Sequence, residues 1–124
     1  MTVFIDSDVL MEILRGQDQT ILSTWRSLAE ARAALLVSPV SVAEIWSAAR
    51  AHEHVQIMRL FHPLLSASID CETGKLAGEY LRKFARSHGL KTADALIAAA
   101  ASRHGAALWT RDRGRYPMQE LSFY

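Results

Sequence analysis

Short runs of apolar residues alternate along this chain with longer segments in which apolar side chains recur every three or four positions. The short runs predict buried strands, and the periodic segments predict helices. The expected strands cover residues 2–5, 35–37, 64–69, 107–109 and 121–124. The expected helices cover residues 9–15, 19–31, 41–50, 53–61, 72–88 and 92–104. Short strands that alternate with helices indicate the α/β class, with a mostly parallel sheet of four to five strands between layers of helices.

Length and composition fit a single globular domain. The chain has 124 residues, of which 50% are hydrophobic and 22% charged, and we expect one domain over residues 1–124. Its longest apolar run, residues 95–101, is too short to span a bilayer. Asp6 interrupts the N-terminus before a secretory signal develops, and the single cysteine, Cys71, excludes an intrachain disulfide. We therefore expect a cytoplasmic protein that does not act at a membrane.

Four acids lie at one edge of the predicted sheet. In a parallel α/β fold, ligands bind beyond the carboxyl ends of the strands. Asp6 ends the first strand, and Asp112 lies just past the fourth. Glu44 and Asp94 stand in the first turns of the third and sixth predicted helices. We therefore expect carboxylates from four separate segments to meet in one pocket.

Three of these acids also have local explanations. Ser41 and Glu44 have the spacing of a capping box, in which the Glu44 side chain bonds back to the backbone N–H of Ser41. Asp94 lies two residues after a Thr92 N-cap and is favoured there by the helix dipole. Asp112 precedes an arginine and a glycine and fits the start of a turn. Both interpretations of these residues stay open.

Asp6 is harder to explain locally. Asp8 fits the N-cap of the first helix, whereas Asp6 directly ends a buried strand, where a carboxylate costs energy unless it is paired or binds a cation. Two carboxylates about 4 Å apart repel by about 4 kcal/mol at an effective dielectric constant near 20. A cluster of acids therefore needs a cation or raised pKa values. Ligand sets made only of oxygen suit Mg²⁺ or Mn²⁺, which activate water and neutralise the charge that develops on a phosphate.

The overall charge gives no general attraction to nucleic acid, because 14 basic residues offset 13 acidic ones and leave a net charge of +1. Basic side chains are nevertheless concentrated locally. Arg111, Arg113 and Arg115 crowd the loop beside Asp112, and Lys91 precedes the sixth helix. These four basic residues are candidates for binding RNA phosphates next to the acids. The alternative is a solvated loop whose charges balance the acids.

Four segments, residues 4–10, 41–45, 92–98 and 109–112, together resemble the PIN-domain ribonucleases of the VapC toxin type. Their order and spacing cover essentially the whole chain. The resemblance implies a PIN-like three-layer sandwich and an endoribonuclease that uses Mg²⁺ or Mn²⁺ to hydrolyse RNA phosphodiester bonds. It also implies a homodimer that acts as the toxin of a toxin–antitoxin pair and is held in check by a cognate antitoxin.

The acidic quartet of that family falls on Asp6, Glu44, Asp94 and Asp112. In this interpretation Asp6 and Asp94 are the principal metal ligands, and Asp112 completes the site or holds a second ion. Glu44 orients or deprotonates the attacking water. The hydroxyl groups expected to support these ligands are those of Ser7 and Thr110.

The chain departs from the family pattern at two places. Asp8 stands where the family commonly carries Asn, which adds a negative charge beside the first ligand. The loop after Asp112 contains Arg113, Gly114 and Arg115, whereas many relatives place a further acid there. The first change adds an acid, and the second replaces one with basic residues.

Two other functions stay open. A strand that ends in Asp6-x-Asp8 also fits a haloacid-dehalogenase-like phosphatase with Asp6 as the nucleophile, although the chain is short for that fold. The third possibility is a non-catalytic PIN-like module that binds RNA or a partner. A covalent aspartyl-phosphate distinguishes the phosphatase, and the lack of Mg²⁺ or Mn²⁺ uptake distinguishes the binding module.

Overall fold

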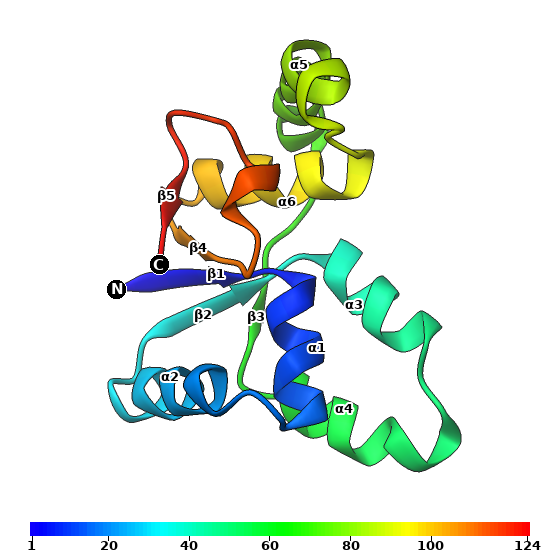
Figure 1. Cartoon of the computed structure of the whole chain (residues 1–124), viewed down its shortest axis with the longest axis vertical. Coiled ribbons are helices and arrows are strands. Elements are labelled where there is room, and N and C mark those ends of the chain that lie inside the picture. The colour runs from blue at the N-terminus through cyan, green and yellow to red at the C-terminus, as the bar shows by residue number, and fades with distance from the viewer.

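The computed structural model describes residues 1–124 and contains one central sheet of five strands (Figure 1). The strand order is β3-β2-β1-β4-β5, and every neighbouring pair is parallel. The strands are β1 (Thr2–Ile5), β2 (Ala34–Val37), β3 (Leu65–Ser66), β4 (Ala107–Trp109) and β5 (Ser122–Phe123). The predicted α/β class is confirmed, with a sheet that is parallel throughout.

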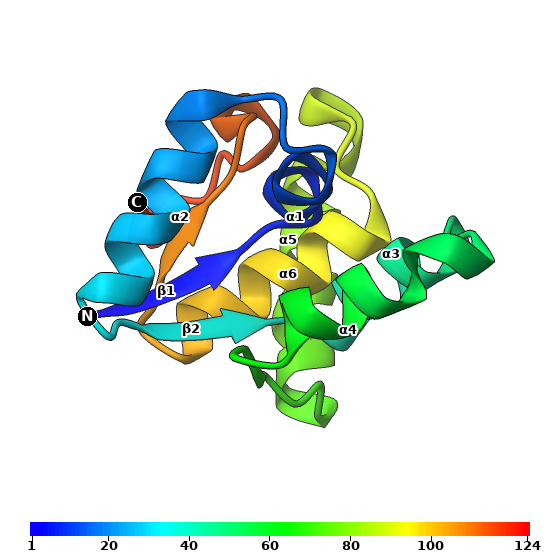
Figure 2. The same cartoon turned by 90° about the horizontal axis from the view of Figure 1, so that it is seen from below.

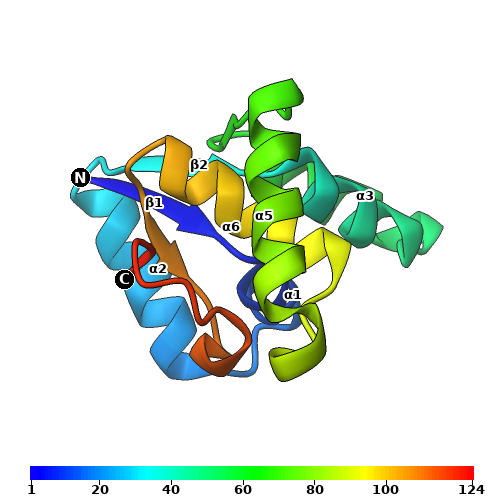
Figure 3. The ribbon, with the colours of Figure 1, turned by 90° about the horizontal axis from the view of Figure 1, so that it is seen from above.

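Six α-helices lie against this sheet. They are α1 (Ser7–Arg15), α2 (Gln19–Glu30), α3 (Pro39–Ser47), α4 (His54–Phe61), α5 (Cys71–His88) and α6 (Thr92–Arg103). Two 3-10 turns are η1 (Ala51–Glu53) and η2 (Arg113–Arg115). Helices α5 and α6 lie on one side of the sheet, and α1, α2 and α4 lie on the other, as the views from below and above show (Figures 2 and 3). No helix combines the length and the apolar character that crossing a membrane requires.

The two faces of β1 divide the core into two clusters, because successive side chains of a strand point to opposite sides. Phe4 packs with Leu108 and the alanines of α6, whereas Val3 and Ile5 pack with apolar side chains of α1 to α4. The fully buried alanines of α6 are Ala95, Ala98, Ala99, Ala100 and Ala101. Their small side chains let α6 approach both the sheet and α5 closely. The central strand β1 therefore emerges from a dense core at its carboxyl end.

The starts of two helices differ from the predicted ones. Helix α1 has Asp6 as its N-cap, with Oδ1 accepting the Ser7 N–H at 2.8 Å, so Asp8 is not the cap and lies in the first turn. Helix α3 begins at Pro39, after a Ser38 N-cap whose hydroxyl accepts the N–H of Val40 at 3.1 Å. The prediction that α3 begins at residue 41 was therefore wrong, because the Ser-Pro pair supplies an earlier start.

Other predicted boundaries held or shifted slightly. Gly16 and Gly89 end α1 and α5 in the left-handed conformation, with φ of 69° and 63°, as expected for glycine at a helix end. Thr92 is the first residue of α6 and Lys91 occupies the N-cap position, so Thr92 is not the cap. The third strand contains only Leu65 and Ser66 of the six residues predicted.

Candidate active site

Asp6 is a buried carboxylate whose two oxygens are both hydrogen-bonded. It follows β1 directly, and the residue is 1% exposed. Besides the bond from the Ser7 N–H to Oδ1, two hydroxyl groups donate to Oδ2: Thr110 at 2.8 Å and Tyr116 at 2.7 Å. Thr110 follows β4, the parallel neighbour of β1. The sheet therefore sets the direction of the Asp6 carboxylate, and the predicted support from Thr110 is present.

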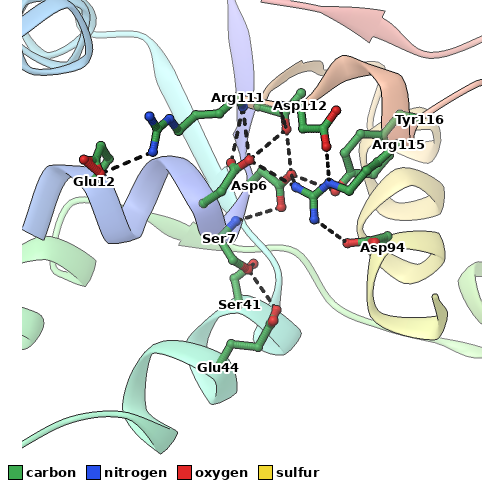
Figure 4. A network of polar contacts seen from close by, with 12 residues as sticks. Asp6, Ser7, Glu12, Ser41, Glu44, Asp94, Arg111, Asp112, Arg115 and Tyr116 are labelled. Atoms are coloured by element: carbon green, nitrogen blue, oxygen red, sulfur yellow. Dashed lines mark hydrogen bonds and ion pairs between the residues drawn. The ribbon is translucent and has the colours of Figure 1, made fainter. Parts of the chain in front are cut away.

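The guanidinium of Arg115 lies among four carboxylates at this edge, and Figure 4 shows it between those of Asp6, Asp94 and Asp112. Its Nη2 is 3.3 Å from Oδ2 of Asp6 and 3.1 Å from Oδ2 of Asp8. Its Nη1 is 3.5 Å from Oδ1 of Asp94, and its Nε is 3.5 Å from Oδ2 of Asp112. These acids come from the end of β1, the first turn of α1, the first turn of α6 and the loop after β4. The structure thus brings Asp6, Asp94 and Asp112 together through one shared cation.

Glu44 lies beside this group and takes part in a separate hydrogen-bond chain (Figure 4). The Ser7 hydroxyl contacts Oε1 of Glu44 at 2.9 Å and the buried hydroxyl of Ser41 at 2.7 Å. Because Ser7 has one hydroxyl proton, it donates to Glu44 while Ser41 donates to Ser7. The capping-box interpretation of Ser41 and Glu44 was wrong, since Ser38 caps α3. Ser7 instead links Glu44 to the start of α1.

Burial and repulsion by neighbouring acids raise the pKa values of Asp8 and Asp94. The pKa of Asp8 is raised, first by burial and then by the charge of Asp6, and the nearby Arg115 offsets part of this rise. Burial also raises the pKa of Asp94, with Arg115 again opposing the change and the charges of Asp6 and Glu44 adding to it. Asp8 and Asp94 are therefore easier to protonate than free carboxyl groups, even with Arg115 beside them.

The two groups that donate to Asp6 from the η2 region have raised pKa values as well. Burial alone would lower the pKa of Arg115, but its surroundings, which include Tyr116 and the charges of Asp6, Asp94 and Asp8, raise it overall. Burial and the charge of Asp6 raise the pKa of Tyr116, so its phenol remains a neutral donor. At neutral pH, Asp6 is therefore held by one charged and two neutral side-chain donors.

The other predicted phosphate-binding residues form no ion pair with the four acids around Arg115. The guanidinium of Arg111 pairs with Glu12 at 3.3 Å on the outer side of α1. The guanidinium of Arg113 donates to the backbone carbonyl of Tyr124 at 3.1 Å. Lys91 is exposed at the N-cap position of α6. Among the four basic candidates, Arg115 is the one that enters the acidic pocket.

Tyr116 and the role of Asp8 were missed by the sequence interpretation. Tyr116 is buried at 2% exposure, yet it follows a loop without hydrophobic periodicity, so no pattern marks it as inward-facing. Asp8 was assigned to capping, and the signal against that assignment was Asp6, which fits the N-cap equally well two residues closer to the strand. A strand that ends in a buried acid needs several donors, and this need is the general clue to Tyr116.

The residues of the pocket fit a metal cation in charge and donor chemistry, because all of its ligand atoms are carboxylate oxygens. The shared Arg115 guanidinium shows that the carboxylates of Asp6, Asp8, Asp94 and Asp112 converge on one positive charge. With Arg115 between them, however, no three of the acids are spaced to enclose a metal ion. The donor set therefore fits a divalent metal ion, and the guanidinium of Arg115 occupies the point on which the acids converge.

Comparison with known proteins places this geometry in a family. The model of the PIN domain matches residues 3–121. The chain belongs to the PIN domain family. Ribonuclease VapC10 from Mycobacterium tuberculosis is 31% identical to this PIN domain over 119 residues, which cover 95% of this chain and 88% of that protein. The resemblance to VapC-type members, read from four short segments, is confirmed.

Solved structures agree with this PIN domain over its whole length. VapBC2 from Rickettsia felis, bound to a DNA fragment from its promoter, superposes with a TM-score of 0.80 at 17% identity and covers 100% of this chain and 98% of that one. A toxin–antitoxin complex from Klebsiella pneumoniae gives a TM-score of 0.74 at 17% identity, covering 96% of this chain and 94% of that one. These likenesses confirm the PIN-like α/β fold.

Proposed function

We propose that this PIN domain is a divalent-metal-dependent endoribonuclease and the toxin of a toxin–antitoxin pair. The observation that carries the proposal is that the carboxylates of Asp6, Asp94 and Asp112 converge on the guanidinium of Arg115 at the carboxyl edge of a parallel sheet. The 31% identity to a VapC ribonuclease supports the reaction class. Capping of α1 explains the position of Asp6, but it does not explain why Asp94 and Asp112 face the same point, whereas phosphodiester hydrolysis by a metal site requires that arrangement.

Each acid is assigned a role from its position. Asp6 and Asp94 are the principal metal ligands, because Asp6 is held rigidly by its donors and Asp94 stands in the first turn of the buried helix α6. Asp112 and Asp8 add negative charge at the open side. When bound, Mg²⁺ or Mn²⁺ lowers the pKa of a coordinated water and neutralises charge on the scissile phosphate. Glu44, oriented through its contact with Ser7, holds or accepts a proton of the attacking water.

The geometry argues against Asp6 as a covalent nucleophile. Oδ1 of Asp6 accepts the Ser7 N–H, and Oδ2 accepts from Thr110, Tyr116 and Arg115. A nucleophilic carboxylate needs one oxygen that a phosphorus atom can reach, and Asp6 is almost fully buried. The haloacid-dehalogenase-like alternative is therefore disfavoured, as the family membership also indicates.

A cognate antitoxin and a second copy of the chain are the proposed protein partners. Apolar side chains are exposed on α4 and next to it: Val55 and Met58 are 58% and 63% exposed, and Leu65 is 58% exposed. Met58 also lines a hollow together with Trp46 and Phe61. Exposed apolar surface of this kind favours protein association. The toxin–antitoxin complex from Klebsiella pneumoniae, which shares the fold, supports an antitoxin as one of the partners.

RNA cleavage with defined metals tests this function. Total bacterial RNA is incubated with the wild type in Mg²⁺, Mn²⁺ or EDTA, and with Asp6→Asn and Asp94→Asn. We expect cleavage with either metal, no cleavage in EDTA, and a loss of about 100-fold or more in both variants, since each removes a charged metal ligand. Products with a 5′-phosphate and a 3′-hydroxyl are expected.

The matched control for these variants is Asp70→Asn. Asp70 caps α5 and pairs with Arg103 at the end of α6 opposite to Asp94, and Asn is an equally good cap. This variant should keep wild-type cleavage, and circular dichroism should show that all variants are folded. Equal cleavage by Asp6→Asn and the wild type, or cleavage that persists in EDTA, contradicts the proposed function.

A further inference from the structure

Arg115 is the only side chain that brings positive charge into the acidic pocket. Its guanidinium lies within 3.5 Å of carboxylate oxygens of Asp6, Asp8, Asp94 and Asp112. Four carboxylates around one point repel one another strongly at the low effective dielectric of a half-buried site. The fold itself brings these carboxylates together, and the guanidinium neutralises part of their negative charge.

The contacts of Arg115 differ in kind from the other contacts of Asp6. Ser7 donates through its backbone N–H, Thr110 donates from the sheet edge, and Tyr116 donates from a side chain that is buried in the core. Arg115 reaches Asp6 through a long side chain that is 37% exposed, and its Nε is buried without a hydrogen-bond partner. If the guanidinium leaves the pocket, Asp6 keeps its bonds to Ser7, Thr110 and Tyr116 and therefore keeps its orientation. The pocket then has room for another cation.

The main chain around Arg115 does not depend on its side chain. The η2 turn is closed by the Arg115 N–H donating to the Asp112 carbonyl at 3.3 Å and by the Tyr116 N–H donating to the Arg113 carbonyl at 3.0 Å. The buried ring of Tyr116 fixes the turn to the core on the other side. The Arg115 side chain can therefore swing toward solvent while the turn stays in place.

We infer that Arg115 is an internal counter-cation that holds the acidic pocket of the metal-free protein and that a divalent ion must displace it. This inference rests on the proposed metal site. The guanidinium stands between the acids, and no three of them are spaced to enclose an ion. Arg115 and the metal exclude each other, so Arg115 stabilises the metal-free chain and lowers the affinity for metal.

A matched pair of variants tests this exclusion. Arg115→Gln and Arg113→Gln remove the same charge from the same turn, but the guanidinium of Arg113 contacts the Tyr124 carbonyl and lies 5.2 Å from the ring centroid of Phe123, not near the acids. Isothermal titration with Mn²⁺ should give Arg115→Gln an affinity about tenfold higher than that of the wild type, equivalent to about 1.4 kcal/mol. Arg113→Gln should stay within about twofold to threefold of the wild type.

The outcomes separate this inference from the proposed function. Equal Mn²⁺ affinities of Arg115→Gln and Arg113→Gln overturn the inference and leave the nuclease proposal intact. If the wild type, Arg115→Gln and Arg113→Gln all fail to bind Mn²⁺, as Asp94→Asn does, the metal site itself is contradicted. The inference about Arg115 and the proposed metal-dependent function are then both overturned. In EDTA, Arg115→Gln should also melt at a lower temperature than Arg113→Gln, and Mn²⁺ should remove that difference.

A second measurement needs no variant and applies even if Arg115→Gln does not fold. In ¹⁵N-labelled wild type, the side-chain Nε–H resonance of Arg115 should move to the region of solvated arginines when diamagnetic Mg²⁺ is added. The corresponding resonance of Arg113 should not move, because its contact with Tyr124 is independent of the pocket. A resonance of Arg115 that is unchanged at saturating Mg²⁺ overturns the inference.

Discussion

At the scale of single residues, the hydrogen bonds around Asp6 fix the orientation of its carboxylate. Asp6 accepts a backbone N–H on one oxygen and two hydroxyl protons on the other. Hydrogen bonds to an ionised acceptor are stronger than neutral ones, and a buried acceptor that loses one is destabilised further. The Tyr116 hydroxyl is the most buried of the side-chain donors and therefore contributes to stability as well as to orientation.

Tyr116→Phe tests this contribution. The variant keeps the packing of the ring and removes the proton donated to Asp6, so we expect the free energy of unfolding in EDTA to fall by about 2 kcal/mol. Urea denaturation measures it. The control is Tyr124→Phe, which keeps the edge-on contact of the ring with Trp109 and should change stability by about 0.5 kcal/mol or less. A loss no larger than that of the control contradicts the role given to Tyr116.

The ionisation of Asp94 makes the stability of the fold depend on pH. Its folded-state pKa is raised above 3.8, mainly by burial, so the folded chain binds a proton there more readily than the unfolded chain does. Stability contributed by this site is therefore lost as the pH rises from about 3.8 through the raised pKa. In EDTA at pH 7, Asp94→Asn should be more stable than the wild type, and the difference should vanish below the unfolded-state pKa.

Asp70→Asn gives the opposite sign as a control. The pKa of Asp70 is lowered, first by the backbone N–H of Thr73 and also by Arg103, so its ionised form favours the folded state. This variant should lose stability at neutral pH and approach the wild type as the pH falls below the lowered pKa. Chemical denaturation at a series of pH values compares the two variants. Parallel curves for both variants contradict the assignment of opposite environments.

At the scale of elements, the start of α3 decides where Glu44 points. Ser38 caps this helix, and Pro39 follows at its first position, where a missing N–H costs nothing. Ser41 then falls inside the first turn, buried against Ser7, and Glu44 falls one turn later with its carboxylate next to the Ser7 hydroxyl. A helix that began at Ser41 would have used Glu44 as a cap instead.

Ser38→Ala tests this assignment. Loss of the cap should lower the free energy of unfolding by about 1 kcal/mol, because the N–H of Val40 loses its acceptor in a buried position. The control is Ser47→Ala in the last turn of α3, whose exposed hydroxyl bonds to the Glu44 carbonyl and should change stability by less than about 0.5 kcal/mol. Equal effects of the two substitutions contradict the early start of α3.

Most elements of this fold are predictable from local patterns. Strand β1 and helix α5 follow directly from an apolar run and from helical periodicity, and glycine in the left-handed conformation marks the ends of α1 and α5. The pattern predicts β3 poorly, because this strand has two exposed residues at the edge of the sheet and depends on pairing with β2. Helix starts are also uncertain where two polar residues compete for the N-cap, as Asp6 and Asp8 do.

At the scale of the whole molecule, the parallel sheet explains why distant residues meet. All strands end at one edge, so Asp6 and Thr110, which are 104 positions apart, become hydrogen-bonded neighbours. That convergence was predictable for Asp6, Asp94 and Asp112 from their positions after strands or at helix starts. The occupation of the pocket by Arg115 was not predictable, since it depends on the three-dimensional course of a loop with three arginines.

The most direct test of this account is a crystal of the protein soaked in Mn²⁺ and measured near the manganese absorption edge. The central claim is that acids from separate segments form one cation site at the carboxyl edge of the sheet. We predict an anomalous peak between the carboxylates of Asp6 and Asp94, with the Arg115 guanidinium turned out of the pocket. No peak there at saturating Mn²⁺, with Arg115 still bridging the acids, would contradict the account.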